Sequence, residues 1–328
     1  MNKDSIVFNE FGRPADVLSL EKMPLTVPKK DEIVVKIHLS PINPSDLIPV
    51  SGAYRHRIEL PGVPGYEGIG IVTQTGDGVP DALLGRRVLP LRGEGTWQTF
   101  VTTKAAHAVL VPDDIDDVTA ACMYINPVTA WVICTETLKL SEGDVLAVNA
   151  CSSFIGRIFA QLSRILKFTL IALVRDDKYK ETLTSLGASY VLNTSTENVN
   201  ETICEVTNRS GADAVIDCVG GEDGTELAFS LKPDGRFLSL GLLSGHQVDW
   251  QRLYSEGIEV SLFHLRHWNK DITVEKWQRT FKILISLVSE GKLDLKNTDK
   301  IFDAAEVSQV LQYIEKRENR GKVFLSFS

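Results

Sequence analysis

The 328-residue sequence has few cysteines, and none of them forms a Cys-x-x-Cys pair. Without such pairs the chain has neither the four-cysteine lobe of a structural zinc site nor the framework of a disulfide-stapled domain. Cysteine is usually a buried residue, so we expect free thiols in the protein interior and a reducing compartment. The five cysteines are Cys122, Cys134, Cys151, Cys204 and Cys218.

Long apolar runs and an excess of basic residues are also missing. No stretch reaches the ~18 apolar residues of a membrane-spanning helix, and residues 1–10 lack the apolar core or Arg/Ser-rich character of a targeting segment. The formal net charge is −8, whereas a nucleic-acid-binding surface has to neutralise phosphates with Lys and Arg. We therefore expect a cytoplasmic protein that binds neither a membrane nor a nucleic acid.

The composition is that of an ordinary globular protein, with 43% apolar and 24% charged residues. A chain of this length is expected to form about two domains. Its first third is rich in Pro, Gly and β-branched residues, which predicts a compact, mostly β domain. The strands expected there are 33–39, 68–75, 87–90 and 97–102.

From about residue 117 the pattern changes to alternating strand-like runs and amphipathic helices, which predicts βαβ units and a parallel, doubly wound sheet. Strands are expected at 145–150, 169–174, 190–192, 214–219 and 237–240, and helices at 127–138, 154–166, 178–186 and 198–207. A long helix at 274–291 and another from about 304 follow. The predicted boundaries are 1–119, 120–262 and 263–328, with the last segment returning to the first domain.

The turn between the first strand of this sheet and the next helix is a candidate dinucleotide site. In such folds the pyrophosphate lies on this turn, because small residues let the backbone approach it and the helix N-terminus supplies amides and a positive dipole. The turn reads Asn-Ala-Cys-Ser-Ser-Phe-Ile-Gly over 149–156 and keeps only Gly156 of the usual glycine fingerprint. On this motif alone, a turn without a cofactor stays an alternative. The candidate pyrophosphate contacts are Ser152, Ser153, Phe154, Ile155 and Gly156.

The end of the second strand favours NADPH. Chains that use NAD place an acid here for the ribose hydroxyl, whereas a basic residue suits the 2′-phosphate. This sequence places Arg175 first, and a guanidinium binds phosphate with two hydrogen bonds. Asp176 and Asp177 follow directly and weaken this prediction. An arginine that caps a surface loop is the alternative.

Short motifs spread over nearly the whole chain share the pattern of one family. They are Asn-Glu-Phe-Gly at 9–12, Pro-Ile-Asn-Pro-Ser-Asp at 41–46, Gly-Ala-Tyr at 52–54, Gly-Tyr-Glu-Gly at 65–68, Gly-Thr-Trp at 95–97, Asn-Pro-Val-Thr-Ala at 126–130, Leu-Gly-Ala at 186–188, Asp-Cys-Val-Gly-Gly at 217–221 and Phe-His-Leu-Arg-His-Trp at 263–268. With them the chain resembles the zinc-independent medium-chain dehydrogenase/reductases, in the branch of quinone oxidoreductases and 2-enoyl thioester reductases. The resemblance implies an α/β fold, in which a GroES-like β-rich catalytic domain accompanies a Rossmann domain with a doubly wound parallel sheet.

The same comparison shows that zinc ligands are missing. Zinc alcohol dehydrogenases carry a cysteine where this chain has residues 43–46, and a His-Glu pair where it has Tyr66 and Glu67. A catalytic zinc needs three protein ligands, and these segments offer one carboxylate in place of the usual set. We therefore expect no metal.

A reductase without a metal has to polarise its acceptor with hydrogen bonds and take a proton from a side chain or water. The resemblance assigns this role to a tyrosine eight residues after the Asp of the Asn-Pro-Ser-Asp motif, which is Tyr54 here. It implies hydride transfer from NADPH to the activated C=C bond of a 2-enoyl thioester or enone. A tyrosine that only packs on its loop is the alternative.

The resemblance also implies further cofactor contacts and a homodimer joined through its nucleotide-binding sheets. The cofactor contacts implied are Asn43, Asn126, Leu240, Gly241, Leu242, Leu243, Phe263, His264, Leu265, Arg266 and Lys322. For the acceptor we expect Trp268 and a basic cluster, Arg55 and Arg57, whose charge suits the phosphates of coenzyme A. Core packing at 240–243 and solvated charges at 55–57 and 322 are the alternatives.

Two other functions stay open. NADPH:quinone reduction needs the same cofactor site and a flat apolar slot for the ring. A sensor or structural protein that binds NADPH without efficient catalysis fits the degraded glycine fingerprint. For a thioester substrate, the net charge of −8 argues against an acidic carrier protein as the partner.

Overall fold

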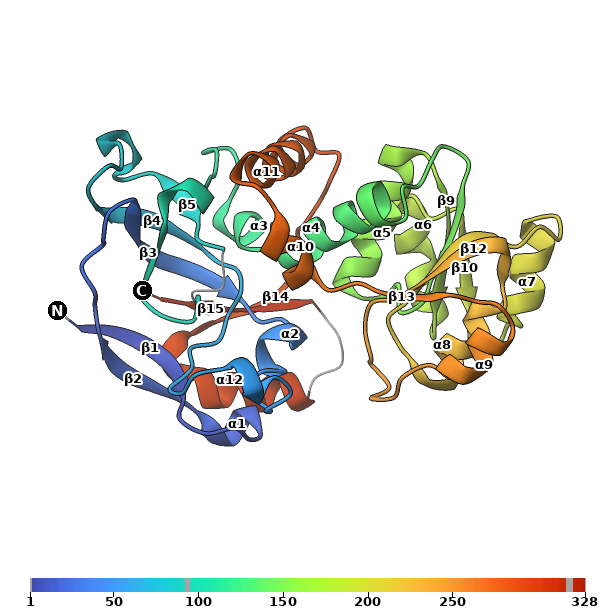
Figure 1. Cartoon of the computed structure of the whole chain (residues 1–328), viewed down its shortest axis with the longest axis horizontal. Helices are drawn as coiled ribbons and strands as arrows, with labels where there is room; N and C mark the ends of the chain where they lie inside the picture. Colours follow the sequence, from blue (N-terminus) through green and yellow to red (C-terminus); the bar gives the residue numbers. More distant parts are fainter. Residues whose placement is uncertain (1, 92–94, 317–320, 328) are drawn as a thin grey trace. The chain divides into compact units, whose positions relative to one another are not determined.

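The computed structural model describes residues 2–91, 95–316 and 321–327 and divides the chain into two compact units (Figure 1). The first unit comprises Met1–Ile125, Ile272–Gly291 and Leu295–Ser328, and the second comprises Asn126–Asp271 and Lys292–Asp294. The divisions fall at residues 125 and 271, where the sequence predicts 119 and 262. The first boundary differs because the end of α3 (Asp117–Ala121) and the turn that leads into α4 (Ile125–Val132) belong to the first unit, and the second because α10 (Leu265–Asp271) belongs to the second unit.

A seven-stranded sheet in the order β14-β15-β3-β4-β5-β7, with β6 paired to β3, forms the frame of the first unit. The long strand β3 packs Ile33, Val35 and Ile37 into the core at zero exposure, as expected from the β-branched run. The strands are β3 (Glu32–Pro41), β4 (Ile69–Thr75), β5 (Arg87–Leu89), β6 (Phe100–Lys104), β7 (Val109–Leu110), β14 (Thr298–Asp303) and β15 (Lys322–Ser326), and β1 (Asn2–Phe8) pairs with β2 (Leu18–Pro24) apart from this sheet.

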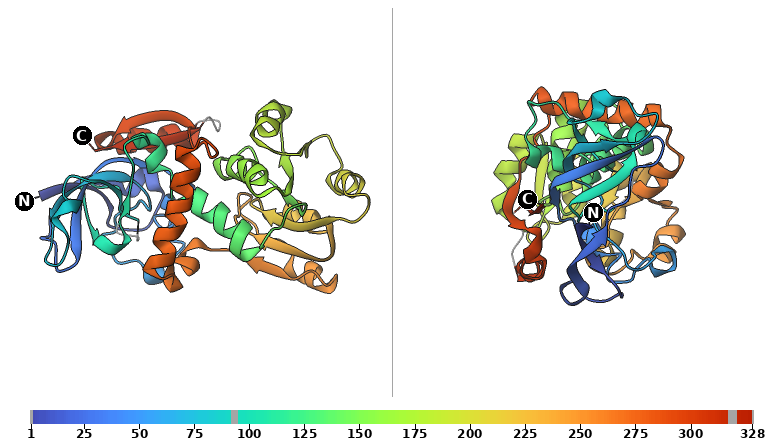
Figure 2. Two further views of the ribbon diagram at one scale, coloured as in Figure 1. Left: turned by 90° about the horizontal axis from the view of Figure 1, so that it is seen from above. Right: turned by 90° about the vertical axis from the view of Figure 1, so that its left-hand side faces the viewer.

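Helix α11 (Val274–Ser289) packs against the first unit through one apolar face. Trp277 and Phe281 on this face are fully buried, and the Trp277 indole donates to the carbonyl oxygen of His107 at 2.9 Å. Figure 2 shows this helix, in orange, beside the strands of the unit. The other elements of the unit are α1 (Pro14–Val17), α2 (Pro44–Leu47), α3 (Asp117–Ala121), α12 (Val307–Lys316) and the 3₁₀ turns η1 (Arg55–Arg57), η2 (Asp81–Leu83), η3 (Ala105–His107) and η6 (Ala304–Glu306).

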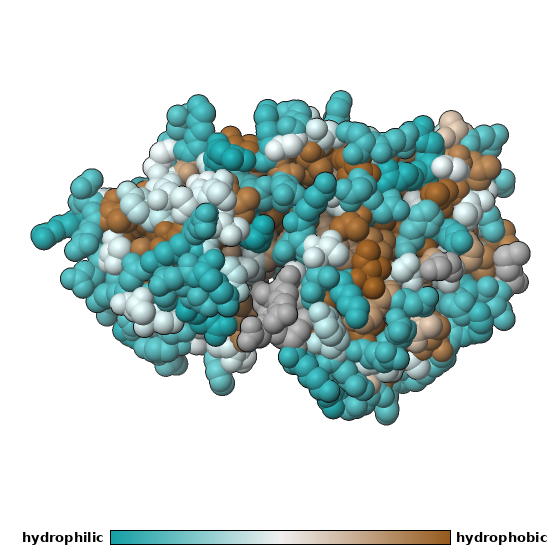
Figure 3. Space-filling view, turned by 180° about the vertical axis from the view of Figure 1, so that it is seen from behind, coloured by the Kyte–Doolittle hydropathy of each residue, from teal (hydrophilic) through white to brown (hydrophobic). Residues whose placement is uncertain are grey.

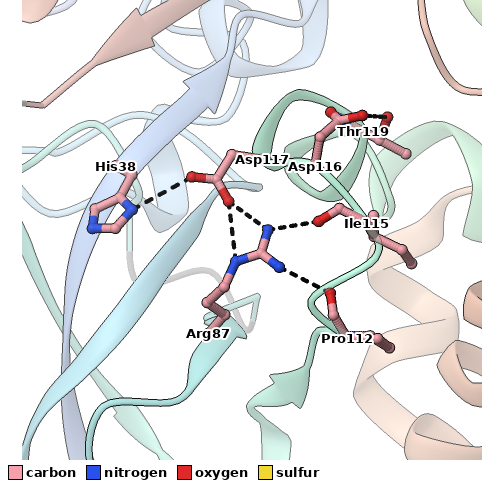
Figure 4. A network of polar contacts seen from close by, with 7 residues as sticks. All are labelled: His38, Arg87, Pro112, Ile115, Asp116, Asp117 and Thr119. Atoms are coloured by element: carbon pink, nitrogen blue, oxygen red, sulfur yellow. Dashed lines mark hydrogen bonds and ion pairs between the residues drawn. The ribbon is translucent and has the colours of Figure 1, made fainter.

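An arginine network fixes the segment that leads into α3 (Figure 4). The Arg87 guanidinium donates to Asp117 at 2.5 and 3.2 Å and to the carbonyl oxygens of Pro112 and Ile115 at 2.8 and 2.7 Å. His38 on β3 lies 3.5 Å from the other oxygen of Asp117. With four hydrogen bonds to three residues, this guanidinium holds strand β5 and the loop before α3 together.

The second unit contains a parallel six-stranded sheet in the order β10-β9-β8-β11-β12-β13. Counted from β8, this is the doubly wound order 3-2-1-4-5-6, and the predicted fold class is confirmed. The strands are β8 (Val145–Val148), β9 (Thr169–Val174), β10 (Tyr190–Asn193), β11 (Ala212–Asp217), β12 (Leu231–Ser239) and β13 (Val260–Leu262); the remaining helices are η4 (Ile133–Thr137), α5 (Phe154–Leu166), η5 (Asp177–Tyr179), α6 (Lys180–Leu186), α7 (Val199–Val206), α8 (Gly221–Ala228) and α9 (Trp250–Ser255).

The cysteines and the surface agree with most of the expectations from composition. All five thiols are free, and four are buried, whereas Cys204 is exposed, so the prediction of burial is wrong for that residue. Hydrophilic residues cover much of the face drawn in Figure 3. None of the helices within the described ranges combines the length and the apolar character that crossing a bilayer requires.

Candidate active site

The turn after β8 lets a ligand come close to the backbone. Ser153 caps α5, and its hydroxyl accepts a hydrogen bond from the Gly156 amide at 3.3 Å. A Cβ on Gly156 would lie 2.4 Å from the Cα of Cys151, so this position requires glycine. Ala150 takes a φ of 52°, a left-handed conformation that glycine usually supplies. The degenerate sequence thus keeps the geometry of a dinucleotide turn, with residues 152–155 partly exposed on it.

Two buried polar side chains join the ends of β8 and β11, where the strand order reverses. Asn149 donates to Asp217 Oδ1 at 2.6 Å and accepts from the Cys218 amide at 2.6 Å. Asp217 also accepts from the amides of Val219 and Gly220 at 3.0 Å. Ligands of doubly wound folds bind at this reversal, so the pair shapes the site. The sequence did not predict this pair, although both residues lie at the ends of strands expected at 145–150 and 214–219.

Arg175 follows β9 and is exposed, and within the described residues its guanidinium has no hydrogen bond or ion pair. Each of the two acids behind it has a lysine partner: Asp176 lies 2.9 Å from Lys178, and Asp177 lies 3.1 Å from Lys180. Hydrogen bonds from these lysines hold the pKa of both carboxyls below the usual range. Lys180 also lies 3.1 Å from Glu197, so Asp176, Asp177 and Glu197 balance the two lysines and Arg175, and the exposed Arg175 guanidinium is the group here that suits a phosphate.

The segments predicted to meet the nicotinamide lie at the same edge of the parallel sheet as the turn. The Leu240 amide at the end of β12 donates to the carbonyl oxygen of Asp217 at 2.7 Å, and the Phe263 amide donates to that of Ser239 at 3.1 Å. Leu242 and Leu243 are 48% and 67% exposed. Because these apolar side chains point to solvent, they are not packed in the core of the second unit, which was the alternative for them.

Helix α10 starts with two aromatic contacts. The rings of His264 and His267 stack at 5.4 Å, and burial lowers the pKa of His264, with His267 adding to the effect. The Arg266 amide donates to His264 Nδ1 at 3.2 Å. The Trp268 indole donates to Glu136 on the π-helical turn η4 at 3.1 Å. Trp268 is therefore fixed within the second unit, with its ring partly exposed.

In the first unit, the motifs at 65–68 and 95–97 pack on each other. Gly65 has a φ of 95°, and a Cβ there would lie 2.3 Å from the indole of Trp97. The Thr96 amide donates to the carbonyl oxygen of Gly65 at 3.0 Å, and its hydroxyl donates to that of Glu67 at 2.8 Å. These contacts fix the backbone of Tyr66 and Glu67, the pair that replaces the His-Glu pair of the zinc enzymes.

Glu67 is the centre of a buried polar network. Its Oε1 accepts from the amide group of Asn43 at 2.8 Å and lies 3.5 Å from Lys322 Nζ, which also donates to Asn43 Oδ1. Its Oε2 accepts from the backbone amides of Tyr124 and Ile125 at 3.2 and 2.8 Å. Glu67 is 0% and Lys322 is 6% exposed, so the alternative of a solvated lysine is wrong. The structure thus brings two of the predicted cofactor contacts, Asn43 and Lys322, together around a carboxylate that sequence analysis noted only as a motif residue.

A second buried carboxylate lies next to this network. Asp46 accepts from the amides of Asn43 and Tyr66 at 2.7 and 3.0 Å. Burial, with a smaller contribution from the neighbouring Glu67, raises the pKa of Asp46 to about 7. Burial also raises the pKa of Tyr66 to about 12, so this phenol is protonated at neutral pH. Both side chains line a cleft of about 370 Å³ whose apolar wall includes Phe8, Pro49, Ile58, Pro61 and Val63.

Tyr54, the predicted proton donor, is half-buried on the loop beside this cleft. The Arg57 guanidinium lies over its ring, with the Cζ atom 3.8 Å from the ring centroid. Arg55 lies over a different ring, Phe11, at 5.6 Å. The two arginines of the basic cluster therefore contact two different aromatic side chains.

The residues in place of the zinc ligands do not suit a metal ion. Over the ranges that the structure covers, no three His, Cys, Asp or Glu side chains gather into a possible metal site. The position beside Glu67 already holds the ammonium group of Lys322, and a second cation there would be repelled at short range. The lysine charge thus neutralises the carboxylate.

Comparison with known proteins gives a consistent result. Residues 29–113 match the alcohol dehydrogenase GroES-like domain, and residues 155–289 match the family described as zinc-binding dehydrogenase. The mitochondrial enoyl-[acyl-carrier-protein] reductase of Rattus norvegicus is 30% identical over 296 residues, which cover 88% of this chain and 79% of that protein.

Two solved structures extend this result over essentially the whole chain. A protein from Bacillus thuringiensis, provisionally named NADPH:quinone reductase, has a TM-score of 0.97 and 52% identity, with 100% of both chains covered. The mycobacterial protein Rv1454c, complexed with NADPH, has a TM-score of 0.87 and 26% identity, with 99% of this chain and 100% of that chain covered. The chain belongs to the medium-chain dehydrogenase/reductase superfamily, in the branch of quinone oxidoreductases and enoyl thioester reductases, and it is an oxidoreductase, as its motifs predict.

Proposed function

We propose that the protein is an NADPH-dependent reductase that adds a hydride to the activated C=C bond of a 2-enoyl thioester or enone without a metal ion. The observation that carries this substrate class is the similarity to an enoyl reductase over 88% of the chain, with Tyr54 at the spacing of the branch. The cleft beside the Tyr54 loop has an apolar wall that suits the hydrocarbon part of such a substrate, and its polar side chains include Asp46 and Tyr66.

The second unit fits NADPH. Its glycine-dependent turn at 149–156 suits a pyrophosphate, and Arg175 is available to a 2′-phosphate. When bound, NADPH supplies the hydride. The complex of Rv1454c with NADPH supports this cofactor. We assign the nicotinamide side to Asn126, residues 240–243 and 263–266, and we retain Asn43 and Lys322 as predicted contacts.

Tyr54 supplies the proton in this proposal. Its hydroxyl hydrogen-bonds the thioester oxygen as negative charge develops there, or transfers its proton to the α-carbon. In that transfer the O–H bond breaks, the electron pair of the enolate forms the new C–H bond, and solvent water reprotonates the phenolate. Tyr66 is protonated at neutral pH and keeps a second phenol beside the cleft.

The role of Tyr54 is tested with Tyr54→Phe on a crotonyl thioester. We expect kcat/KM to fall ~10²-fold, because a positioned proton donor typically contributes this much. Tyr190→Phe on the edge strand β10 serves as a matched control and keeps full activity. A Tyr54→Phe enzyme within about twofold of the wild type would remove the proposed role.

NADPH:quinone reduction is the second candidate, because the Bacillus thuringiensis protein carries that provisional name. The two are separated by following NADPH oxidation with crotonyl-CoA, with 1,4-benzoquinone and with no acceptor. Faster turnover of crotonyl-CoA supports the first candidate, and turnover of the quinone alone supports the second. Tight NADPH binding without turnover of either acceptor identifies a sensor or structural protein.

For the assembly, we propose a cytoplasmic homodimer that pairs two copies of the edge strand β13. This strand ends the sheet, and Leu262 on it is 70% exposed; unpaired edges of this kind favour pairing with another chain. A Leu262→Lys variant should elute as a monomer in size-exclusion chromatography.

For the acceptor, Trp268 stays a predicted contact, and Arg55 and Arg57 stay predicted partners of the phosphates of coenzyme A.

A further inference from the structure

The loop that carries Tyr54 folds so that Arg57 comes to lie on the tyrosine ring. The Arg57 amide donates to the carbonyl oxygen of Tyr54 at 3.0 Å and closes the 3₁₀ turn η1. In this type of turn the side chains at i and i+3 eclipse each other. The spacing of three residues therefore places the guanidinium above the ring, with its Cζ 3.8 Å from the centroid.

This contact restrains a side chain that has little other support from regular structure. Tyr54 lies between the short helix α2 and the turn η1, in a segment without a strand or a long helix, and such loops are the more mobile parts of a fold. A guanidinium on the face of an aromatic ring is held by attraction to the ring quadrupole and by stacking. The stack restrains the plane of the ring, in which the C–O bond of the phenol lies.

The contact also places a positive charge beside the phenol. When the hydroxyl gives its proton to the substrate, negative charge develops on the phenol oxygen, and a cation already in place stabilises it without rearrangement. Arg55 in the same turn gives a contrast, because it lies over Phe11 at 5.6 Å and its Nε donates to the carbonyl oxygen of Gly52 at 3.4 Å. Phe11 has no hydroxyl group, so a cation on its ring cannot assist a proton transfer.

We propose that Arg57 is a positioning residue that acts on the substrate through Tyr54, whereas Arg55 has no such role. This inference rests on the proposed function of Tyr54 as proton donor. The two arginines of the basic cluster then have different roles, and Arg55 is the candidate for contact with the phosphates of coenzyme A.

The test is a double-mutant cycle of Arg57→Met and Tyr54→Phe, measured on crotonyl-CoA and on the crotonyl thioester of N-acetylcysteamine, which has no phosphates. We expect Arg57→Met to lower kcat about tenfold on both substrates with little change in KM. In the Tyr54→Phe background the same substitution should change kcat less than twofold, because its target is absent. Arg57→Lys, which keeps a charge but not the planar stack, should recover part of the loss, and Arg279→Met, at an exposed position on helix α11, should keep kcat.

Each other outcome identifies a different failure. Equal losses from Arg57→Met in both backgrounds would overturn the inference, since Arg57 would then act independently of the phenol. A rise in KM confined to crotonyl-CoA would also overturn it and identify Arg57 as a phosphate contact. Full activity of Tyr54→Phe alone would overturn the proposed role of Tyr54 and, with it, this inference. Unchanged melting temperature and NADPH affinity of Arg57→Met exclude misfolding, and Arg57→Lys provides a second variant.

Discussion

The two units hold their candidate site residues through different kinds of contact. In the second unit the nucleotide turn depends on the backbone and on short contacts, such as the Ser153 cap on an amide three residues later. In the first unit the polar network depends on buried side chains from distant positions, with Asn43 and Glu67 separated by 24 residues and Asn43 and Lys322 by 279. The second unit is therefore sensitive to changes of backbone shape, and the first to changes of charge.

Removing the buried ammonium should have the largest effect. Lys322→Met leaves Glu67 as an uncompensated charge at zero exposure, which typically costs about 3–5 kcal/mol. We expect a large fall in the midpoint of denaturant unfolding of the first unit. The double variant Lys322→Met with Glu67→Gln removes both charges and should regain most of the loss. A double variant as unstable as the single one would show that the lysine acts by packing and not by charge.

The second effect is a pH dependence of stability caused by Asp46. Burial raises its pKa to about 7 in the folded protein, whereas an unfolded aspartate titrates near ~3.9. Between these values the folded state keeps a proton that the unfolded state has lost, so this group makes stability fall as pH rises, by at most about 1.4 kcal/mol per pH unit. Above pH 7 the fall stops.

The measurement compares the wild type with Asp46→Asn in urea at a series of pH values. The difference in unfolding free energy between the two proteins isolates the contribution of this carboxyl from all other acids. We expect the wild type to lose stability relative to the variant from about pH 4 to pH 7. A difference that stays constant over this range would contradict a raised pKa.

A substitution that displaces the backbone of the turn at 149–156 should lower both the stability and the NADPH affinity of the second unit. Gly156→Ala places a Cβ 2.4 Å from the Cys151 backbone, and such overpacking typically costs about 1–3 kcal/mol. Because the clash displaces the turn itself, NADPH affinity measured by fluorescence titration should fall together with stability. Ser185→Ala, at an exposed position on helix α6 of the same unit, adds no atom and should leave both close to the wild type. An unchanged NADPH affinity in Gly156→Ala would argue against a pyrophosphate at this turn.

The smallest effect should be a loss of cofactor preference. Arg175→Ala removes a charge-assisted contact to a 2′-phosphate, so the Kd for NADPH should rise about tenfold or more. The Kd for NADH should stay the same, since NADH lacks this phosphate, and it serves as the internal control. Equal losses for both cofactors would place Arg175 away from the 2′-phosphate.

The second unit was largely predictable from the sequence because its elements are local and periodic. Helix α5 at Phe154–Leu166 and strand β9 at Thr169–Val174 agree with the expected ranges. The pairing of Asp176 with Lys178 and of Asp177 with Lys180 could not be predicted from the sequence, since these contacts form only when the chain folds, and Lys180 also contacts Glu197.

The first unit was harder to predict because its order depends on contacts between distant segments. The strand expected at 97–102 begins at Phe100, since Trp97 leaves the strand pattern to pack on Gly65. Strands β1 and β2 were missed because neither alternates clearly: the last four residues of β1 are all buried, and β2 is mostly exposed and carries charged residues. The motifs contain Asp46 and Glu67, but they do not predict that both carboxylates are buried beside Lys322. That burial depends on how the sheet brings distant segments of the chain together.

The position of Lys322 also has a consequence for biosynthesis. It lies on β15, which inserts between β14 and β3, and the whole second unit precedes it in the chain. During synthesis the ribosome makes the second unit while the carboxylates of the first unit still lack their cation. Chains fold as they emerge, at about 5–20 residues per second, so the first unit passes through a stage in which Glu67 has no ammonium partner. Strand β15, which is made after the second unit, therefore supplies the cation that completes this network.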